Sequence, residues 1–164
     1  MRLLTVVGAR PQFIKAAALS RAIAASAGAI QEQILHTGQH YSYEMDGVFF
    51  EELELPLPHL NIAIGSRPAE EQLAAMEDGL RPVFEREHPA WVMVEGDTNS
   101  VLAAANAAHG TGHRVGHVEA GLRSYDLTMP EERNRIATDR IADQLYRSKE
   151  DAIAVVKVPT RGGV

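Results

Sequence analysis

The stretch that decides the fold runs from Trp91 to Arg135 and holds three polar runs: EGDT at 95–98, HVEAGLRS at 117–124 and PEERNR at 130–135. The apolar segment at 92–94 leads into the first run, residues 114–116 lead into the second, and a turn-rich loop leads into the third. Acidic side chains directly after buried strands are typical of α/β proteins, which bind ligands outside the carboxyl ends of their strands. This stretch therefore predicts an α/β fold with a polar site along one edge of its sheet.

Composition indicates one ordinary globular domain. The chain has 164 residues, of which 45% are hydrophobic and 23% are charged. A formal net charge of −6 weighs against nucleic acid or an anionic membrane as the main partner. Cysteine is absent, which excludes disulfides, thiolate metal sites and cysteine nucleophiles. Arg10, Pro11 and Lys15 interrupt the apolar N-terminal region too early for a signal peptide, and no stretch approaches the roughly 20 apolar residues of a membrane span. We therefore expect a cytoplasmic protein.

Apolar runs and helical periodicity alternate along the chain. Strands are expected at 3–7, 31–37, 90–95 and 115–118, and helices at 12–25, 46–53, 68–87, 100–108 and 130–144. Pro82 falls inside the third helix, which predicts a kink or a break near Gly79. Pro130 suits the first position of the last helix. The alternation predicts right-handed crossovers and a Rossmann-like parallel sheet with helices on both faces.

The turn after the first strand, GARPQ at 8–12, joins that strand to a helix N-terminus. Free backbone N–H groups and the helix dipole attract phosphate at such a point, and Arg10 would add a bidentate contact. Lys15 lies one turn further on, where it would point to the same anion. The turn lacks the Gly-x-Gly-x-x-Gly pattern of dinucleotide sites. A plain strand–helix turn with exposed Arg10 and Lys15 is an equally good interpretation.

Three acidic positions are candidates for proton transfer. Asp97 follows a strand, where an aspartate is often only a helix cap that stabilises by about 1 kcal/mol. Glu119 directly follows a buried strand, so it either pairs with Arg123 or belongs to a site with a shifted pKa. Glu131 and Arg135 have the i,i+4 spacing of an ordinary helical ion pair. Because all three acids are expected at the carboxyl edge of one sheet, a shared site is the better interpretation.

The seven histidines do not form a recognisable metal pattern. Glycines interrupt the pair His36 and His40 and the set His109, His113 and His117, so neither group is expected on one helix. No His-Glu-x-x-His motif is present. We therefore predict no metal site, and regard His40 and His117, near strand ends, as candidates for ligand contact.

Five motifs, in this order along the chain, resemble those of the non-hydrolysing UDP-N-acetylglucosamine 2-epimerases: GARP at 8–11, TGQHY at 37–41, GDT at 96–98, HVEAGLRS at 117–124 and PEERNR at 130–135. The resemblance covers residues 1–145. It implies a Rossmann-like domain corresponding to the N-terminal half of a glycosyltransferase-B-type fold. Residues 146–164 would then form a C-terminal helix or tail, and the second, UDP-binding domain would be absent.

The resemblance also implies a reaction, the interconversion of UDP-GlcNAc and UDP-ManNAc without a cofactor. In this family the C2 proton is removed and UDP is expelled to give 2-acetamidoglucal, and UDP adds back after protonation on the other face. By motif match the catalytic acids are Asp97, Glu119 and Glu131, and the substrate-binding residues are Arg10, Lys15, His40, Arg123 and Arg135. Neither a metal, nucleic acid nor a membrane is implied as a partner, and a homodimer formed through this domain is expected.

Two regions depart from the family pattern. Family members usually have Gly-Thr-Arg-Pro-Glu where this chain has GARPQ at 8–12, so one hydroxyl and one carboxylate are missing. After Leu145 the family continues with Pro-Thr-Glu and a second domain that carries most of the uridine and diphosphate binding, whereas this chain has YRSKE at 146–150. We therefore expect an epimerase domain that turns over substrate poorly alone. The alternatives are a non-catalytic nucleotide-sugar-binding or assembly domain, or a glycosyltransferase-B fragment of other specificity.

Overall fold

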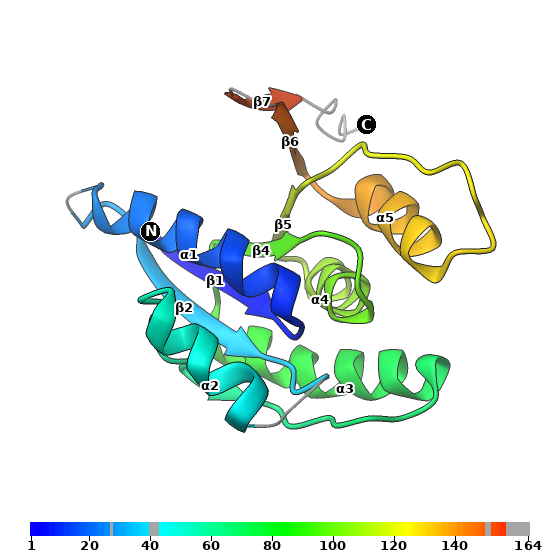
Figure 1. Ribbon diagram of the computed structural model, residues 1–164, viewed down its shortest axis with the longest axis horizontal. Coiled ribbons are helices and arrows are strands. Elements are labelled where there is room, and N and C mark those ends of the chain that lie inside the picture. Colours follow the sequence, from blue (N-terminus) through cyan, green and yellow to red (C-terminus); the bar gives the residue numbers. More distant parts are fainter. Residues whose placement is uncertain (27, 40–42, 150–151, 157–164) are drawn as a thin grey trace.

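A computed structural model describes residues 1–26, 28–39, 43–149 and 152–156, which form one sheet between two layers of helices (Figure 1). The strands are β1 Arg2–Val7, β2 Gln31–His36, β3 Leu60–Asn61, β4 Trp91–Glu95, β5 Arg114–Val118, β6 Gln144–Lys149 and β7 Ala152–Val156. The helices are α1 Arg10–Ala24, α2 Tyr43–Glu52, α3 Ala69–Glu87, α4 Asn99–Gly110 and α5 Pro130–Ile141.

The strand order places the carboxyl ends of β1 and β4 at the centre of the sheet. The order across the described sheet is β3-β2-β1-β4-β5-β6-β7, with β1 to β6 parallel and β7 antiparallel to β6. From β1 the chain proceeds to one side of the sheet, and from β4 it proceeds to the other. A crevice opens where the winding direction reverses, so this topology predicts a ligand site beyond β1 and β4.

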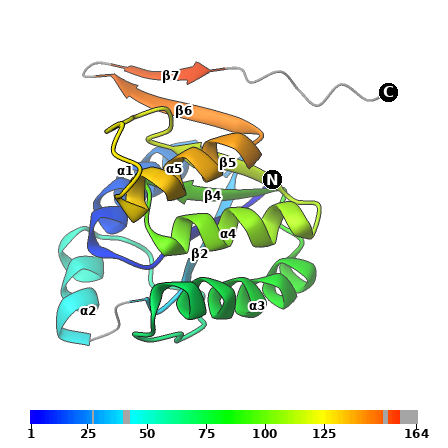
Figure 2. The same ribbon diagram turned by 90° about the vertical axis from the view of Figure 1, so that its right-hand side faces the viewer.

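Both faces of the sheet are covered, which explains why its central strands are apolar throughout. Figure 2 shows α3, α4 and α5 on one face and α1 and α2 on the other. Successive side chains of a strand point to opposite faces. Leu4 and Val6 accordingly join the core under α3 and α4, whereas Val7 packs with Phe13 of α1 and Phe50 of α2. The predicted parallel α/β sheet with helices on both faces is confirmed, with β7 as an antiparallel addition.

The predicted break in the third helix is absent, because α3 continues from Ala69 to Glu87 with Pro82 inside it. Proline removes the hydrogen bond to the carbonyl four residues earlier, which belongs to Asp78. Both Pro82 and Asp78 are exposed, so water can reach the freed carbonyl. Leu80 and Phe84, on either side of the proline, are fully buried and hold both halves of the helix in the core.

The chain after residue 145 forms strands in its described part, which corrects the expectation of a helix or tail from 146. The predicted boundary falls inside β6, where Leu145 and Tyr146 pair with His117 and Val118 of β5. The apolar, partly β-branched sequence AIAVV at 152–156 favours a strand over a helix. Residues 157–164, predicted as a tail, lie outside the described residues. Among the described helices, none is long and apolar enough to cross a membrane.

Candidate functional site

The turns after β4 and β5 lie side by side at the carboxyl edge of the sheet. The Gly96 N–H donates to the Val118 carbonyl at 3.1 Å, which ties the EGDT run to the HVEAGLRS run. Gly96 has a φ of +86° and Glu119 a φ of +67°. A non-glycine residue in this left-handed region stores backbone strain, and such strain is concentrated at functional sites. We call Asp97, Glu119 and Glu131, with their cationic neighbours, the carboxylate edge.

Glu119 is paired with Lys15, which α1 brings to the end of β5. The Lys15 Nζ donates to Glu119 Oε2, and the two side chains are 30% and 25% exposed. A Cβ atom at Gly96 would lie 3.5 Å from both of these atoms, so the pair sits directly over that glycine. The alternative pairing of Glu119 with Arg123 is wrong, because Arg123 Nη2 binds Asp139 Oδ2 at 2.6 Å.

Asp97 is paired with Arg135 across the chain, with Nη2 and Oδ2 2.5 Å apart. The side chain of Asn134 also donates to the Asp97 carbonyl, at 3.0 Å. Burial raises the pKa of Asp97, and the negative charges of Glu119 and Glu131 act in the same direction against the Arg135 guanidinium. A carboxyl group with a raised pKa is suited to take and return a proton. Arg135 therefore forms its ion pair with Asp97, whereas the i,i+4 spacing in the sequence suggested a helical ion pair with the exposed Glu131.

Glu95 is a buried acid beside this site, 1% exposed, for which the sequence pattern predicted no role. Burial raises its pKa to about 8, so it holds a proton at neutral pH. It lines a cavity of about 340 Å³ together with Lys15, Glu119, Leu19 and Tyr146. An acid at the last position of an apolar strand was the available signal, because such a side chain points into a covered face of the sheet.

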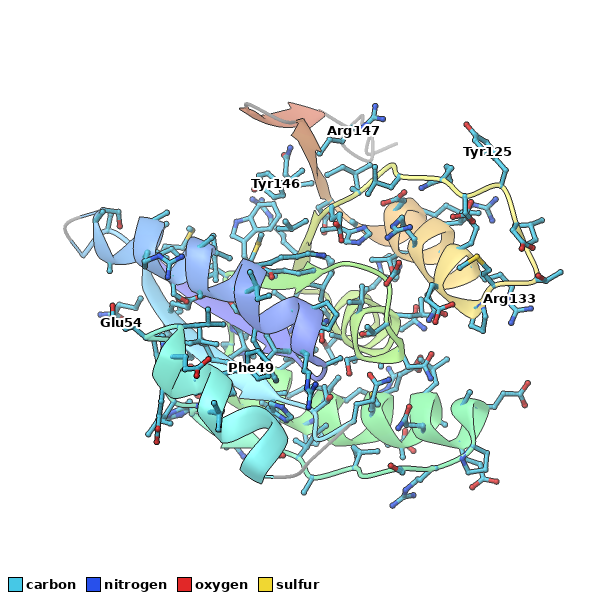
Figure 3. The ribbon with its side chains drawn as sticks, viewed as in Figure 1. Phe49, Glu54, Tyr125, Arg133, Tyr146 and Arg147 are labelled. Atoms are coloured by element: carbon cyan, nitrogen blue, oxygen red, sulfur yellow. The ribbon has the colours of Figure 1, made fainter. Side chains whose placement is uncertain are left out.

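The turn between β1 and α1 is held closed by the side chain of Gln12. Gln12 Oε1 accepts hydrogen bonds from the N–H groups of Gly8 at 2.8 Å and Ala9 at 2.9 Å. The Arg10 guanidinium lies 5.5 Å from the ring centre of Phe49, the residue labelled on α2 in Figure 3. Arg10 and Lys15 therefore do not point to one shared position, and two of the N–H groups predicted to bind phosphate already have a partner.

The two histidines considered for ligand contact have different outcomes. His117 is fully buried, with both ring nitrogens hydrogen-bonded inside the protein, so it does not face a ligand. His40 lies outside the described residues. Among the residues that the structure describes, no group of three or more histidine, aspartate or glutamate side chains is arranged to hold a metal ion.

The second glutamate of PEERNR anchors the loop before α5. Glu132 is 2% exposed and accepts hydrogen bonds from the backbone N–H groups of Ser124 at 3.1 Å and Tyr125 at 3.2 Å. These hydrogen bonds lower the pKa of Glu132. Figure 3 shows Tyr125 pointing away from the body of the molecule, and its side chain is 88% exposed. Glu132 therefore fixes the loop, and the neighbouring Glu131 is left at the surface.

Comparison with known proteins gives a consistent match. A family profile for UDP-N-acetylglucosamine 2-epimerase matches residues 21–157. A homologue of that enzyme from Methanococcus maripaludis is 47% identical over 152 residues, which are 93% of this chain and 42% of the relative. The UDP-N-acetylglucosamine 2-epimerase of Methanocaldococcus jannaschii is 46% identical over 93% of this chain and 41% of its own. A UDP-2,3-diacetamido-2,3-dideoxy-D-glucuronate 2-epimerase from Pseudomonas aeruginosa is 43% identical over 96% of this chain and 44% of its own.

Solved structures show the same likeness. The M. jannaschii epimerase in complex with UDP-GlcNAc and UDP superposes with a TM-score of 0.87 at 46% identity, covering 92% of this chain and 41% of that structure. The Neisseria meningitidis epimerase bound to UDP-GlcNAc superposes with a TM-score of 0.84 at 32% identity, with coverage of 92% and 41%. The chain thus spans about two fifths of the length of these relatives.

Proposed function

The chain belongs to the UDP-N-acetylglucosamine 2-epimerase family, and from that premise we propose that its carboxylate edge is the sugar-side half of an epimerase active site. The family and the α/β fold implied by the sequence motifs are thereby confirmed for the N-terminal portion of these enzymes. One observation supports the proposal most strongly. Two ion pairs from distant parts of the chain, Lys15 with Glu119 and Asp97 with Arg135, meet at this edge.

The proposed reaction interconverts UDP-GlcNAc and UDP-ManNAc. A carboxylate removes the C2 proton, the C1–O bond breaks with its electron pair leaving on the UDP oxygen, and a C1–C2 double bond forms. A carboxyl group then returns a proton to the opposite face of C2, and the UDP oxygen bonds again to C1. This sequence needs positioned acids and bases on both faces of one carbon. We assign these roles to Asp97, Glu119 and Glu131 as a set.

The departing diphosphate needs positive charge. Lys15 and Arg135 each neutralise a carboxylate in the described structure, and an incoming phosphate would compete for both. Arg10, exposed at the start of α1, can extend this positive surface. His40 and Arg123 complete the proposed substrate-binding set, in which Arg123 acts from its ion pair with Asp139.

The chain contains about two fifths of the length of its relatives, so we propose that efficient turnover requires the remaining portion. A non-catalytic nucleotide-sugar-binding or assembly role for these 164 residues is the second candidate. The substrate class is also open to a direct test. The P. aeruginosa relative is named for a diacetamido sugar acid, and its identity of 43% is close to the 46% of the M. jannaschii enzyme.

Calorimetric titration of the full chain tests this function, using UDP, UDP-GlcNAc and the UDP-linked diacetamidoglucuronate. We expect weak binding of UDP-GlcNAc that falls about tenfold in Glu119→Gln, because one charged contact is lost. Glu85→Gln, an exposed glutamate of α3, is the matched control and should bind as the unaltered chain does. Absence of binding to all three ligands would leave only the assembly role.

An epimerase assay on the same sample separates the remaining possibilities. We expect turnover only when the C-terminal portion of a relative is added as a separate chain. Turnover by the chain alone would confirm the epimerase and overturn the need for that portion. Homodimers and a cytoplasmic location stay predictions, and light scattering of the purified chain tests the former.

A further inference from the structure

The ring of His117 is held between two hydrogen-bond acceptors. Its Nε2 lies 2.7 Å from the Gly96 carbonyl oxygen, which can only accept. Its Nδ1 lies 2.8 Å from Asp139 Oδ1. The second oxygen of Asp139 accepts from Arg123 Nη2 at 2.6 Å and from the Gly121 N–H at 3.1 Å. Neutral imidazole has only one N–H group, so it cannot satisfy two acceptors.

Asp139 is ionised in this arrangement. Burial raises the pKa of its carboxyl group, but hydrogen bonds from His117, Arg123 and the Gly121 backbone together bring that pKa below its ordinary value. A carboxylate has no proton to donate to Nδ1. Both ring nitrogens of His117 must therefore donate, and the ring carries a positive charge inside the protein.

We propose that His117 is a buried imidazolium whose ion pair with Asp139 is the link that positions the carboxylate edge. The charge state follows from the two hydrogen-bond contacts of the ring together with the ionised carboxylate of Asp139. The catalytic meaning of the positioning rests on the proposed function. His117 is thus a positioning residue, since its ring is fully buried and both ring nitrogens are bonded within the protein.

The link joins the three elements that carry the catalytic candidates. Gly96 is held by β5 on both sides, because its N–H donates to the Val118 carbonyl and its own carbonyl accepts from His117. This fixes the turn that leads into Asp97. Asp139 belongs to α5, the helix whose first turn carries Glu131, and it accepts from the Gly121 N–H two residues after Glu119. One ion pair therefore sets the spacing of all three acids.

Among the described residues, charged groups near the ring come from α5, from the loop after β5 and from β6, whose Arg147 Nε would lie 3.0 Å from a Cβ atom at Gly121. Asp139 faces it from α5, and Arg123 faces Asp139 from the loop after β5. Glu95 is adjacent to Gly96 in the chain, but its side chain points to the other face of the sheet. The β4–β5 register pairs His117 with Val94 and Val118 with Glu95, and successive residues of a strand point to opposite faces. Removing the charge of Asp139 would leave the ring without its counter-ion, and a buried charge without a partner is strongly unfavourable. In Asp139→Asn the ring should lose one proton, because the asparagine amide can donate to Nδ1.

Nitrogen NMR of the full chain tests the charge. In the unaltered chain at neutral pH both ring nitrogens of His117 should carry protons, because each faces an acceptor. In Asp139→Asn one ring nitrogen should be unprotonated under the same conditions. Arg140→Gln removes an exposed charge next to Asp139 on α5 and should leave the ring doubly protonated. An unprotonated ring nitrogen in the unaltered chain would overturn the assignment, and that measurement needs no variant to fold.

Amide hydrogen exchange tests the positioning role without any ligand. Exchange at Gly96 and Gly121 should be about tenfold faster in Asp139→Asn than in Arg140→Gln, the change expected when a charge-assisted hydrogen bond is lost. Arg123→Gln removes one partner of Asp139 from a partly exposed position and should accelerate Gly121 as well. Unchanged exchange at both glycines would overturn the positioning role. Failure of UDP-GlcNAc to bind would instead overturn the proposed function, and leave these results standing.

Discussion

The turn after β1 and the turns after β4 and β5 lie at the same edge of the sheet but are closed in opposite ways. The first turn is closed locally, since Gln12 binds backbone groups only three and four residues away. The other two turns are closed by distant partners, since Lys15 and Glu119 are 104 residues apart and Asp97 and Arg135 are 38 apart. We infer that the first turn mainly supports the fold, whereas the carboxylate edge presents charges with which a ligand can pair.

The two regions should contribute differently to the free energy of unfolding. Buried, well-packed groups of the first turn should matter for the free energy of unfolding. Partly exposed ion pairs contribute little to that free energy, because water screens them and ordering their side chains costs entropy. Variants at the two regions should therefore separate stability from ligand binding.

The largest effect is expected at Gly8. A Cβ atom there would lie 2.1 Å from Ser100 Oγ and 2.2 Å from Thr37 Oγ1, two buried hydroxyls that are hydrogen-bonded to each other. Gly8→Ala should lower the free energy of unfolding by about 3 kcal/mol, the upper end of overpacking penalties. Gly79→Ala in α3 is the control and should be neutral or stabilising, because alanine favours a helix and its nearest contacts would be the Cδ1 atoms of Ile62 at 3.3 Å and Ile64 at 3.7 Å. Equal denaturation midpoints for the two variants would contradict this account of the first turn.

Gln12 tests whether local closure stabilises the fold. Gln12→Ala removes two hydrogen bonds to the turn and a third from Nε2 to the Glu95 carbonyl, so we expect a loss of about 2 kcal/mol in chemical denaturation. Gln12→Glu restores the residue that the family usually has. It keeps an acceptor for the turn and loses only the donor, so its loss should be smaller. A larger loss for the glutamate variant would show that its charge, near the buried Glu95, dominates.

Glu95, beside the carboxylate edge, should make the stability of the protein depend on pH. Its pKa rises from an ordinary value of 4.5 to about 8 through burial, so the folded state holds a proton that the unfolded state has lost between these values. Stability from this group is complete below the lower value and is lost as pH rises toward about 8. His36 has the opposite effect on stability. Burial lowers its pKa from 6.5 to about 4, so stability from this group is lost as pH falls below 6.5.

The pH dependence of stability should be measured above pH 6.5, where Glu95 still titrates and His36 no longer does. From pH 6.5 to about 8, the unfolding free energy should fall by at most about 1.4 kcal/mol per pH unit, the value for one linked proton. Glu95→Gln should flatten this slope and be more stable than the unaltered chain at the alkaline end. A slope that persists in the glutamine variant would assign the proton to another group.

The smallest stability effect is expected at Lys15. Lys15→Gln breaks the pair with Glu119, whose side chains are about a quarter to a third exposed, and should change the unfolding free energy by about 0.5 kcal/mol or less. Its affinity for UDP-GlcNAc should nevertheless fall about tenfold, as for loss of a charged contact. Lys15→Arg keeps the charge and should recover part of the affinity. A large loss of stability without a change in binding would reverse the comparison between the two regions.

Only part of the candidate site could be predicted from the sequence. Asp97, Glu119 and Glu131 each follow a strand or lie at the start of a helix, and such positions are visible in the local pattern. The contacts of Gln12 and Asp139 could not be predicted, because an amide in a first turn and an aspartate late in a helix look like ordinary surface residues until their partners are known.

The sequence was enough to predict β1, β2, β4, β5 and the five described helices in their order, the carboxyl edge as the place of the polar runs, and the family, but it did not predict β3, β6 or β7. The predicted features follow from apolar periodicity and turn residues, which act over a few neighbouring residues. Only the tertiary structure decided which charges pair: Glu119 with Lys15 rather than Arg123, and Arg135 with Asp97 rather than Glu131. It also decided that His117 lies inside the protein. Strand order and helix placement set distances between residues far apart in the chain, and electrostatic pairing depends on those distances.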